Sequence, residues 1–215
     1  MARHIIFAVC IFTFGIALSS FAYFGATKMQ NMMAKIEPAA GDAAPEAVFT
    51  IGGSFELTGE NGEAVTDAQF NDNYKLIFFG FTHCPDVCPA GMQKMSMAMD
   101  KLGDEAKRIT PFFVTIDPRR DTPEVLREYT DMYDERIIGL TGSEEQLQDM
   151  EEKFKVYASK MASEEGEEFY MYAHSSYIYL TDKNNHLLTV FGHDDIPSDI
   201  AKEIKQAIQD DQKTL

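Results

Sequence analysis

Two of the chain's three cysteines, Cys84 and Cys88, are separated by only three residues. Residues 76–81, just before the pair, are mostly apolar and are typical of a buried strand. Pro89 follows the pair, and proline suits a first helical turn because the backbone N–H groups there have no helical partner. Such unpaired N–H groups and the positive end of the helix dipole favour thiolate over thiol. Two thiolates at this spacing can bind a soft metal ion or exchange with a disulfide.

The elements around the cysteines alternate between strand and helix. Apolar runs and turn signals predict strands over residues 49–57, 63–66, 74–81, 111–116, 137–140, 176–181 and 187–191. The first two strands and the last two are each predicted to form a hairpin, with turns at residues 59–62 and 182–186. Periodicity and capping residues predict helices over residues 89–102, 123–132, 144–154 and 196–208. Ser143 and Gln146 are predicted to form a capping box at the start of the third of these helices. This order is similar to that of a thioredoxin-like α/β fold, with the cysteines between the first central strand and the first helix.

The N-terminal segment predicts a transmembrane helix. Residues 5–25 carry no charged side chain and are about as long as a helix that crosses a bilayer. A cleavable signal peptide is the alternative, because small residues stand at the end of the segment, but its apolar region would usually be shorter. Cys10 lies inside this run, and we interpret it as a small apolar residue rather than a lipid attachment point.

The chain is predicted to have three parts. Residues 1–27 form the anchor, residues 28–47 a flexible linker and residues 48–215 a thioredoxin-like domain that carries the cysteine pair. The linker contains charged residues, several alanines, two prolines and one glycine, and it has no periodic apolar face. The remaining length supports one core. The chain's acidic balance, with 35 Asp and Glu against 19 Lys and Arg, disfavours binding to nucleic acid.

Three blocks of sequence resemble the Sco/SenC family of copper proteins. They are residues 80–89, residues 115–123 and residues 174–180. The blocks occur in the family's order, so the resemblance covers essentially the whole domain. It implies that Cys84, Cys88 and His174 bind one copper ion, and that the protein delivers copper to the dinuclear copper-A site of cytochrome c oxidase. Many members of the family have an aspartate directly before the histidine, where this chain has Ala173.

The resemblance also implies a cellular setting. The expected location is a bacterial inner membrane, with a single anchor and the soluble domain in the periplasm. A mitochondrial inner membrane is less favoured because no transit peptide is seen. The expected partners are the oxidase subunit that carries the copper-A site, a periplasmic copper donor and a thiol reductant. The expected role is that of a metallochaperone rather than an enzyme, with thiol–disulfide exchange as an accessory activity.

Two thiolates and a neutral imidazole suit a copper carrier on chemical grounds. They can surround copper(I) in a trigonal set, and they can also hold copper(II), which would lack its preferred fourth ligand. A site with three protein ligands stays open to an incoming ligand from an acceptor. A carrier needs this opening, because transfer proceeds by exchange of ligands.

The alternative function is that of a thiol–disulfide reductase that keeps the acceptor's cysteines reduced. Cys84 and Cys88 could close a disulfide in an oxidising compartment. Redox thioredoxins, however, use a two-residue gap and a proline opposite the thiols, whereas this chain has a three-residue gap and His174 in that neighbourhood. A peroxidase is disfavoured because Phe81 stands where a peroxiredoxin has threonine. A zinc site is chemically possible.

Other reactive side chains have simpler explanations. Three histidines are interpreted as non-ligands, namely His83, His186 and His193. Three methionines on one helical face are interpreted as core packing rather than a copper relay, namely Met92, Met95 and Met99. Asp117 and residues 119–121 follow a strand end, a usual place for functional residues, and could shape a docking surface. Helix capping by Asp121 is the structural explanation of part of that pattern.

Overall fold

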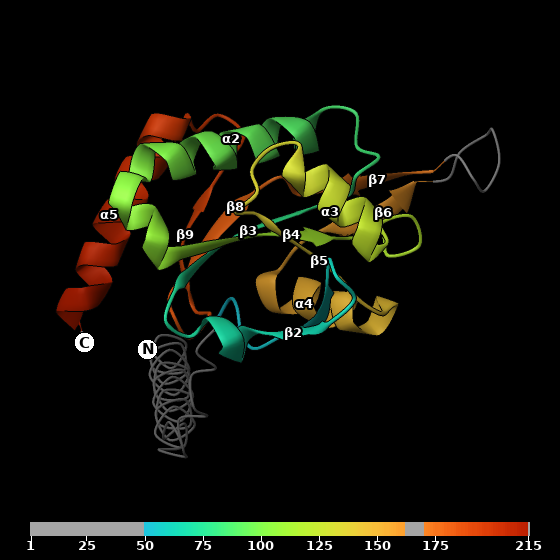
Figure 1. The fold of residues 1–215 in the computed structure, drawn as a ribbon, viewed down its shortest axis with the longest axis horizontal. Coiled ribbons are helices and arrows are strands. Elements are labelled where there is room, and N and C mark those ends of the chain that lie inside the picture. The colour runs from blue at the N-terminus through green and yellow to red at the C-terminus, as the bar shows by residue number, and fades with distance from the viewer. Residues whose placement is uncertain (1–49, 162–169, 215) are drawn as a thin grey trace, which may run out of the picture. The chain divides into compact units, whose positions relative to one another are not determined.

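A seven-stranded sheet forms the centre of the computed structural model, which describes residues 50–161 and 170–214 (Figure 1). The strands lie in the order β2-β1-β5-β4-β3-β8-β9 across the sheet. Their bounds are β1 Glu56–Gly59, β2 Ala64–Thr66, β3 Tyr74–Gly80, β4 Ile109–Thr115, β5 Ile138–Thr141, β8 Ile178–Thr181 and β9 Leu187–Phe191. The pairs β3–β4 and β4–β5 are parallel, whereas β8 pairs with β3 and β9 antiparallel. This mixed sheet confirms the thioredoxin-like α/β fold.

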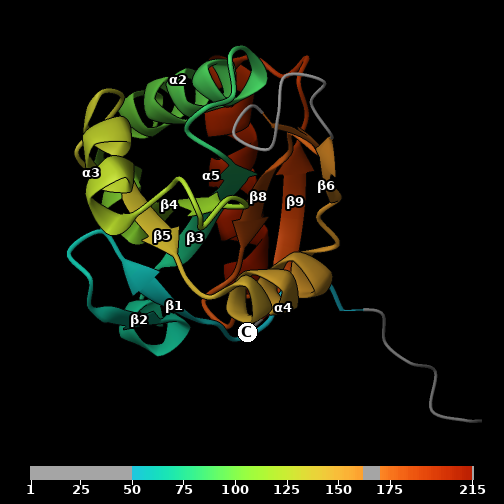
Figure 2. The ribbon, with the colours of Figure 1, turned by 90° about the vertical axis from the view of Figure 1, so that its right-hand side faces the viewer.

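Within the described residues, four α-helices cover the two faces of the sheet (Figure 1 and Figure 2). They are α2 Val87–Leu102, α3 Pro123–Asp131, α4 Glu144–Phe154 and α5 Pro197–Thr214. Two 3-10 helices, η1 Asp67–Phe70 and η2 Gly103–Arg108, were not predicted. Helix α2 packs against α5, and both views place α4 on the opposite side of the sheet from α2.

The ends of β3 and β4 bring two loops together. Every residue of these strands is buried, as parallel strands covered by helices require. Gly80 pairs with Thr115, so the carboxyl ends of the two strands lie side by side. The cysteine loop, residues 81–86, and the β4–α3 loop, residues 116–122, therefore leave the sheet at the same edge.

Capping residues set the start of two helices. The Thr122 hydroxyl accepts a hydrogen bond from the Val125 N–H at the start of α3. Ser143 and Gln146 form the predicted capping box at the start of α4. The prediction that Asp121 caps α3 is wrong, because Thr122 occupies the N-cap position and Asp121 is buried.

A separate two-stranded sheet carries the distal histidine. Strands β6 Ala158–Met161 and β7 Met171–His174 pair antiparallel, with His174 opposite Ala158. This hairpin was not predicted from the sequence, which indicated a strand only from residue 176. Strand β8 begins instead at Ile178, so His174 ends one strand and a short connection leads to the next.

The remaining strand pairs and the last helix compare well with their predictions. Strands β1 and β2 form the predicted antiparallel hairpin, although β1 covers Glu56–Gly59 rather than the predicted residues 49–57. Strands β8 and β9 form the second predicted hairpin. Helix α5 extends to Thr214, beyond the predicted end at residue 208.

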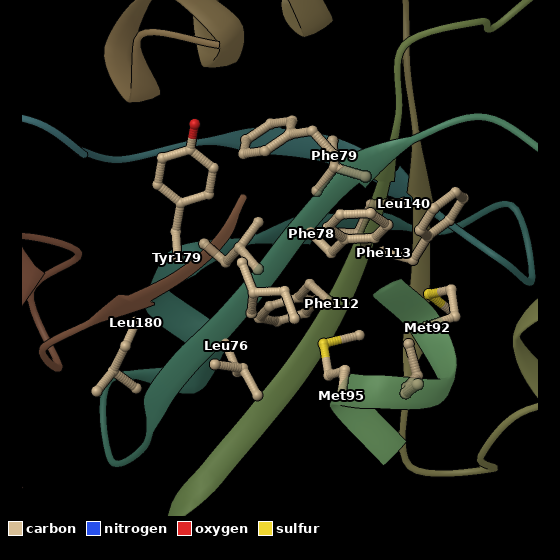
Figure 3. Packing of buried hydrophobic residues seen from close by; sticks show 14 of the residues in the cluster. Leu76, Phe78, Phe79, Met92, Met95, Phe112, Phe113, Leu140, Tyr179 and Leu180 are labelled. Carbon is tan, nitrogen blue, oxygen red and sulfur yellow. The ribbon is translucent and has the colours of Figure 1, made fainter. Parts of the chain in front are cut away.

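Aromatic side chains fill the core on both faces of the sheet (Figure 3). On one face, Phe79 contacts Phe154 of α4 and Tyr179 of β8. On the other face, Phe78 lies against Phe113, and Met92 and Met95 project from α2 towards the sheet. Met92, Met95 and Met99 are at most 1% exposed, which confirms that these methionines are core residues.

The predicted membrane segment lies outside the described residues. This applies to residues 5–25, to Cys10 and to the predicted linker. In residues 50–161 and 170–214, no helix has the length and apolar character needed to cross a bilayer.

Candidate metal centre

The fold brings the three predicted ligands together. The two sulfur atoms and a ring nitrogen of His174 all lie within 4.8 Å of one another. Cys88 is fully buried, Cys84 is 7% exposed and His174 is half-buried. The Sγ atom of Cys88 lies 3.4 Å from Nε2 of His174, although 86 positions separate these residues in the chain. One side of the group is thus closed by the core, while the histidine side reaches the surface.

The start of α2 positions both cysteines. The helix begins at Val87, two residues earlier than predicted, so Cys88 and Pro89 both lie in its first turn. The Cys88 N–H, which has no helical partner there, donates to Cys84 Sγ at 3.4 Å. On the other side of Cys84, its own N–H donates to the carbonyl of Phe81 at 3.2 Å, which closes the cysteine loop. The expected support of a thiolate by a helix N-terminus therefore comes from a specific group, the Cys88 N–H, which donates to the sulfur of Cys84.

Gly80 leaves space for the buried sulfur of Cys88. A Cβ at residue 80 would lie 2.7 Å from Cys88 Sγ and 3.0 Å from the ring of Phe113. Real Cβ atoms essentially never show contacts below 3.0 Å. Glycine at the end of β3 is therefore required by the close approach of α2 to the sheet.

The hydrogen bonds of His174 select its tautomer. Nδ1 lies 2.9 Å from the carbonyl oxygen of Ser175, and a carbonyl can only accept, so Nδ1 carries the proton. Nε2 then presents its lone pair towards Cys88, as a metal-ligating imidazole must. The ring of Phe81 contacts the His174 ring edge-on, with centroids 5.6 Å apart, and limits its rotation.

The two thiols share one proton. The pKa of Cys84 falls to about 3, chiefly because the Cys88 thiol donates a hydrogen bond to it, and backbone N–H groups add to the effect. The pKa of Cys88 is raised because it keeps that proton and because it is buried. Near neutral pH the pair is therefore one thiolate and one thiol. Binding of a metal ion by both sulfurs releases the remaining proton.

Buried carboxylates of the β4–α3 loop support the cysteine loop. Asp117 and Asp121 are both fully buried. Asp121 accepts hydrogen bonds from the backbone and the hydroxyl of Thr82, two residues before Cys84. Residues 115–123, which contain both aspartates, had been singled out as a block that resembles the family. The sequence did not reveal that Asp121 contacts Thr82.

Two other histidines near the centre do not join the ligand group. The His83 side chain is 54% exposed, and its Nδ1 lies 3.1 Å from the Thr82 hydroxyl. His193 lines the cleft beside His174, and its carbonyl accepts a hydrogen bond from Lys94. His186 lies in the β8–β9 turn, where its ring contacts Asp182. None of the three belongs to the group that Cys84, Cys88 and His174 form in the described part of the chain.

An open cleft of about 650 Å³ gives access to His174. Tyr157 and Tyr177 line the cleft and are 63% and 48% exposed. Ala173, which directly precedes the histidine, also lines it. No carboxylate therefore stands at that position beside the histidine. An incoming ligand can approach the metal centre from this side.

Comparison with known proteins identifies the family. Residues 43–209, most of the chain, match the SCO1/SenC family. The chain belongs to the SCO1/SenC family. A SCO2-like protein of Rickettsia felis is 42% identical over 155 residues, which cover 72% of this chain and 76% of the relative.

Solved Sco structures share the fold. The copper-bound ScoI of Bradyrhizobium japonicum is 35% identical and superimposes with a TM-score of 0.67, over 73% of this chain and 99% of that one. BsSco, described as a member of the Sco family of cytochrome c oxidase assembly proteins with a disulfide switch, is 25% identical with a TM-score of 0.56. That match covers 72% of this chain and 91% of BsSco.

The donor set fits a copper ion. Thiolate sulfur is a soft ligand that copper(I) prefers, and imidazole nitrogen suits both oxidation states. The three donor atoms are close enough together to contact a single ion. The group can therefore bind one copper ion.

Proposed function

We propose that the protein is a membrane-anchored metallochaperone that delivers copper to the dinuclear copper-A site of cytochrome c oxidase. The observation that carries the proposal is the convergence of Cys84, Cys88 and His174 within 4.8 Å. The copper bound in a related Sco protein and the oxidase-assembly role of BsSco support it. Copper is cargo here, so the site must both hold the ion and release it.

The chemistry of the three residues explains binding. The Cys84 thiolate is already formed in the metal-free protein, and the Cys88 thiol loses its proton when the ion binds. His174 supplies nitrogen through Nε2 while its Nδ1–H stays bonded to Ser175. The imidazole adds the harder donor that copper(II) needs beside sulfur.

Release depends on the open side of the centre. The cysteines are buried under the β3–α2 junction, whereas His174 lies beside the cleft. An acceptor's ligand can enter on the histidine side and bind the ion while both sulfurs still hold it. Successive exchange of ligands then moves the copper without freeing it into solution.

The proposal includes an anchor. Residues 1–27 would hold the protein in the membrane, residues 28–47 would act as the linker, and residues 48–215 would form the copper-binding domain outside the cytoplasm. The uncharged run at residues 5–25 supports this arrangement. The location most consistent with it is a bacterial inner membrane, with the domain in the periplasm.

A thiol–disulfide reductase is the second candidate, favoured by the low pKa of Cys84. The Cys84 thiolate would attack an acceptor disulfide and displace one acceptor thiolate. Cys88, after losing its proton, would then attack Cys84, which leaves a Cys84–Cys88 disulfide and two reduced acceptor cysteines. The disulfide switch of BsSco supports this reading.

The two functions are separated by supplying the reductase's product in advance. The acceptor is a soluble oxidase domain with an empty copper-A site whose cysteines have been reduced chemically. A chaperone loaded with copper fills this acceptor faster than free copper at a matched concentration. If free copper fills it equally fast, and the metal-free reduced domain restores an oxidised acceptor, the reductase is the correct function. The zinc and copper contents of the purified domain are measured together. Bound zinc in place of copper would establish a zinc site, and bound copper without zinc would exclude one.

A further inference from the structure

The proposed ligands come from two segments that both contact the β4–α3 loop. We propose that this loop is a positioning frame, in which Asp121 holds the cysteine loop and the Asp117–Arg120 pair holds the strand that carries His174. The inference rests on the proposed copper function. It assigns distinct roles to residues that do not contact the metal.

Asp121 clamps the cysteine loop. Its Oδ2 accepts the Thr82 backbone N–H at 3.0 Å, and its Oδ1 accepts the Thr82 hydroxyl at 2.6 Å. The Thr115 hydroxyl donates to Oδ2 at 2.6 Å, which fixes the carboxylate against the end of β4. All these bonds form at a side chain with no exposed surface. Only one residue separates Thr82 from Cys84, so a displacement of Thr82 would also move Cys84, the first proposed ligand.

Asp117 and Arg120 hold the start of β7. Asp117 accepts hydrogen bonds from Arg120 Nε and from the Tyr170 hydroxyl, the latter at 2.7 Å. Arg120 Nη1 donates to the Tyr170 carbonyl at 3.0 Å, and its guanidinium lies 3.7 Å from the Tyr170 ring centroid. Tyr170 directly precedes β7, whose last residue is His174.

The contacts of Asp117 and Arg120 with Tyr170 matter because β7 has no partner strand in the main sheet. Within the described residues, it pairs only with β6. The position of His174 therefore depends on side-chain contacts of the hairpin with the domain body. Phe81 makes one such contact with His174, and the Arg120 guanidinium lies 5.8 Å from the Phe81 ring, so Arg120 also lies beside a side chain that contacts the histidine.

The frame thus has two arms, the Asp121 contacts and the Asp117–Arg120 contacts. Disturbing each arm should cause a different defect in copper binding. Loosening the cysteine loop affects both oxidation states, because both require the sulfurs. Loosening β7 affects copper(II) more, because copper(I) is held adequately by two thiolates. A general loss of stability would not separate the two ions in this way.

The test uses one variant for each arm and a control. Asp121→Asn keeps the shape of the side chain but cannot accept all three donors, and Arg120→Lys keeps the charge but loses the planar fork. Thr82→Val and Tyr170→Phe remove one hydroxyl from each arm, in case a first variant fails to fold. The control is Asp67→Asn. Asp67 also accepts a backbone N–H and a side-chain amide, from Phe55 and Asn185, on another part of the sheet.

Affinities for copper(I) and copper(II) are measured by competition with chelators, and the sulfur-to-copper(II) charge-transfer spectrum is recorded. Asp121→Asn should weaken both affinities about 10- to 100-fold, the usual cost of removing an outer-sphere hydrogen bond in metal sites. Arg120→Lys should weaken copper(II) binding about tenfold, shift the spectrum and leave copper(I) binding nearly unchanged. Asp67→Asn should change neither affinity, even where it lowers the melting temperature. Wild-type affinities and spectra in the arm variants would overturn the inference.

A copper-free measurement separates this inference from the proposed function. The equilibrium between the Cys84–Cys88 thiols and their disulfide is measured against glutathione. Asp121→Asn should shift this equilibrium severalfold towards the thiols, whereas Arg120→Lys and Asp67→Asn should not. If the wild-type domain failed to bind copper, the proposed function would be refuted, and this equilibrium would still decide whether Asp121 positions the cysteines.

Discussion

Adding one methyl group at Gly80 should disturb the copper centre without touching any proposed ligand. In Gly80→Ala, the new Cβ would meet Cys88 Sγ at 2.7 Å, whereas ordinary contact begins at 3.4 Å. The sulfur or the backbone must therefore move by about 0.7 Å, which exceeds the roughly 0.5 Å that a functional site tolerates. Because Cys88 is fully buried and Phe113 blocks the other side, no free space absorbs the methyl group.

Two effects follow from this crowding. Overpacking of a filled core costs about 1–3 kcal/mol of unfolding free energy. Displacement of Cys88 should weaken copper(I) binding by at least about tenfold, the lower end of the range for disturbed metal sites. Urea unfolding of the metal-free domain and competition with a copper(I) chelator measure the two effects separately.

Gly192→Ala is the matched control. Gly192 follows β9 as Gly80 ends β3, but a Cβ there meets nothing nearer than 3.8 Å. This variant should keep wild-type stability and copper affinity. If Gly80→Ala also kept both, the packing argument that places Cys88 Sγ against the end of β3 would be refuted.

Three further predictions concern the ligands and a buried acid. His174→Ala should weaken copper(II) binding much more than copper(I) binding, because two thiolates alone can hold copper(I), whereas His186→Ala should change neither; equal losses for the two ions would contradict the assigned role of the imidazole. Oxidation of Cys84 and Cys88 to a disulfide should abolish copper uptake, measured as metal bound per domain, and its reduction should restore uptake. Burial raises the pKa of Glu151 to about 7 from 4.5, so the unfolding free energy should decrease as the pH rises from about 4.5 to 7, where the folded state holds the proton more tightly. After allowance for solvent screening at this half-buried site, Glu151→Gln should stabilise the domain by about 1–2 kcal/mol at pH 8 and have almost no effect at pH 4; an equal effect at both pH values in urea unfolding would contradict the burial argument.

The sequence predicted those parts of the fold that depend on local patterns. The apolar run before Cys84 indicated β3, and the box formed by Ser143 and Gln146 indicated the start of α4 to the residue. These signals are strong because a buried strand and a helix cap each need particular residue types at neighbouring positions.

The hairpin that carries His174 gave no such signal. Strand β6 is mostly exposed and contains Ser159 and Lys160, so it lacks the apolar alternation of a half-buried strand. Its pairing with β7 depends on contacts outside the main sheet, which local pattern does not encode.

The role of Asp121 was also beyond local pattern. An aspartate before Thr122 and Pro123 resembles a helix cap, and the sequence pattern predicts that role for it. Its partner Thr82 lies 39 positions away and meets it only because β3 and β4 are parallel neighbours. The sequence block had indicated that Asp121 was important, but only the tertiary structure shows that it holds Thr82 rather than capping α3.

X-ray absorption spectroscopy of the copper-loaded domain, combined with its metal content, tests the central claim most directly. The account predicts one copper ion per domain, with two sulfur atoms and one histidine nitrogen in its coordination shell, and with the nitrogen lost in His174→Ala. A shell with fewer than two sulfur atoms, or a nitrogen that persists in His174→Ala, would contradict the claim that Cys84, Cys88 and His174 together hold the ion.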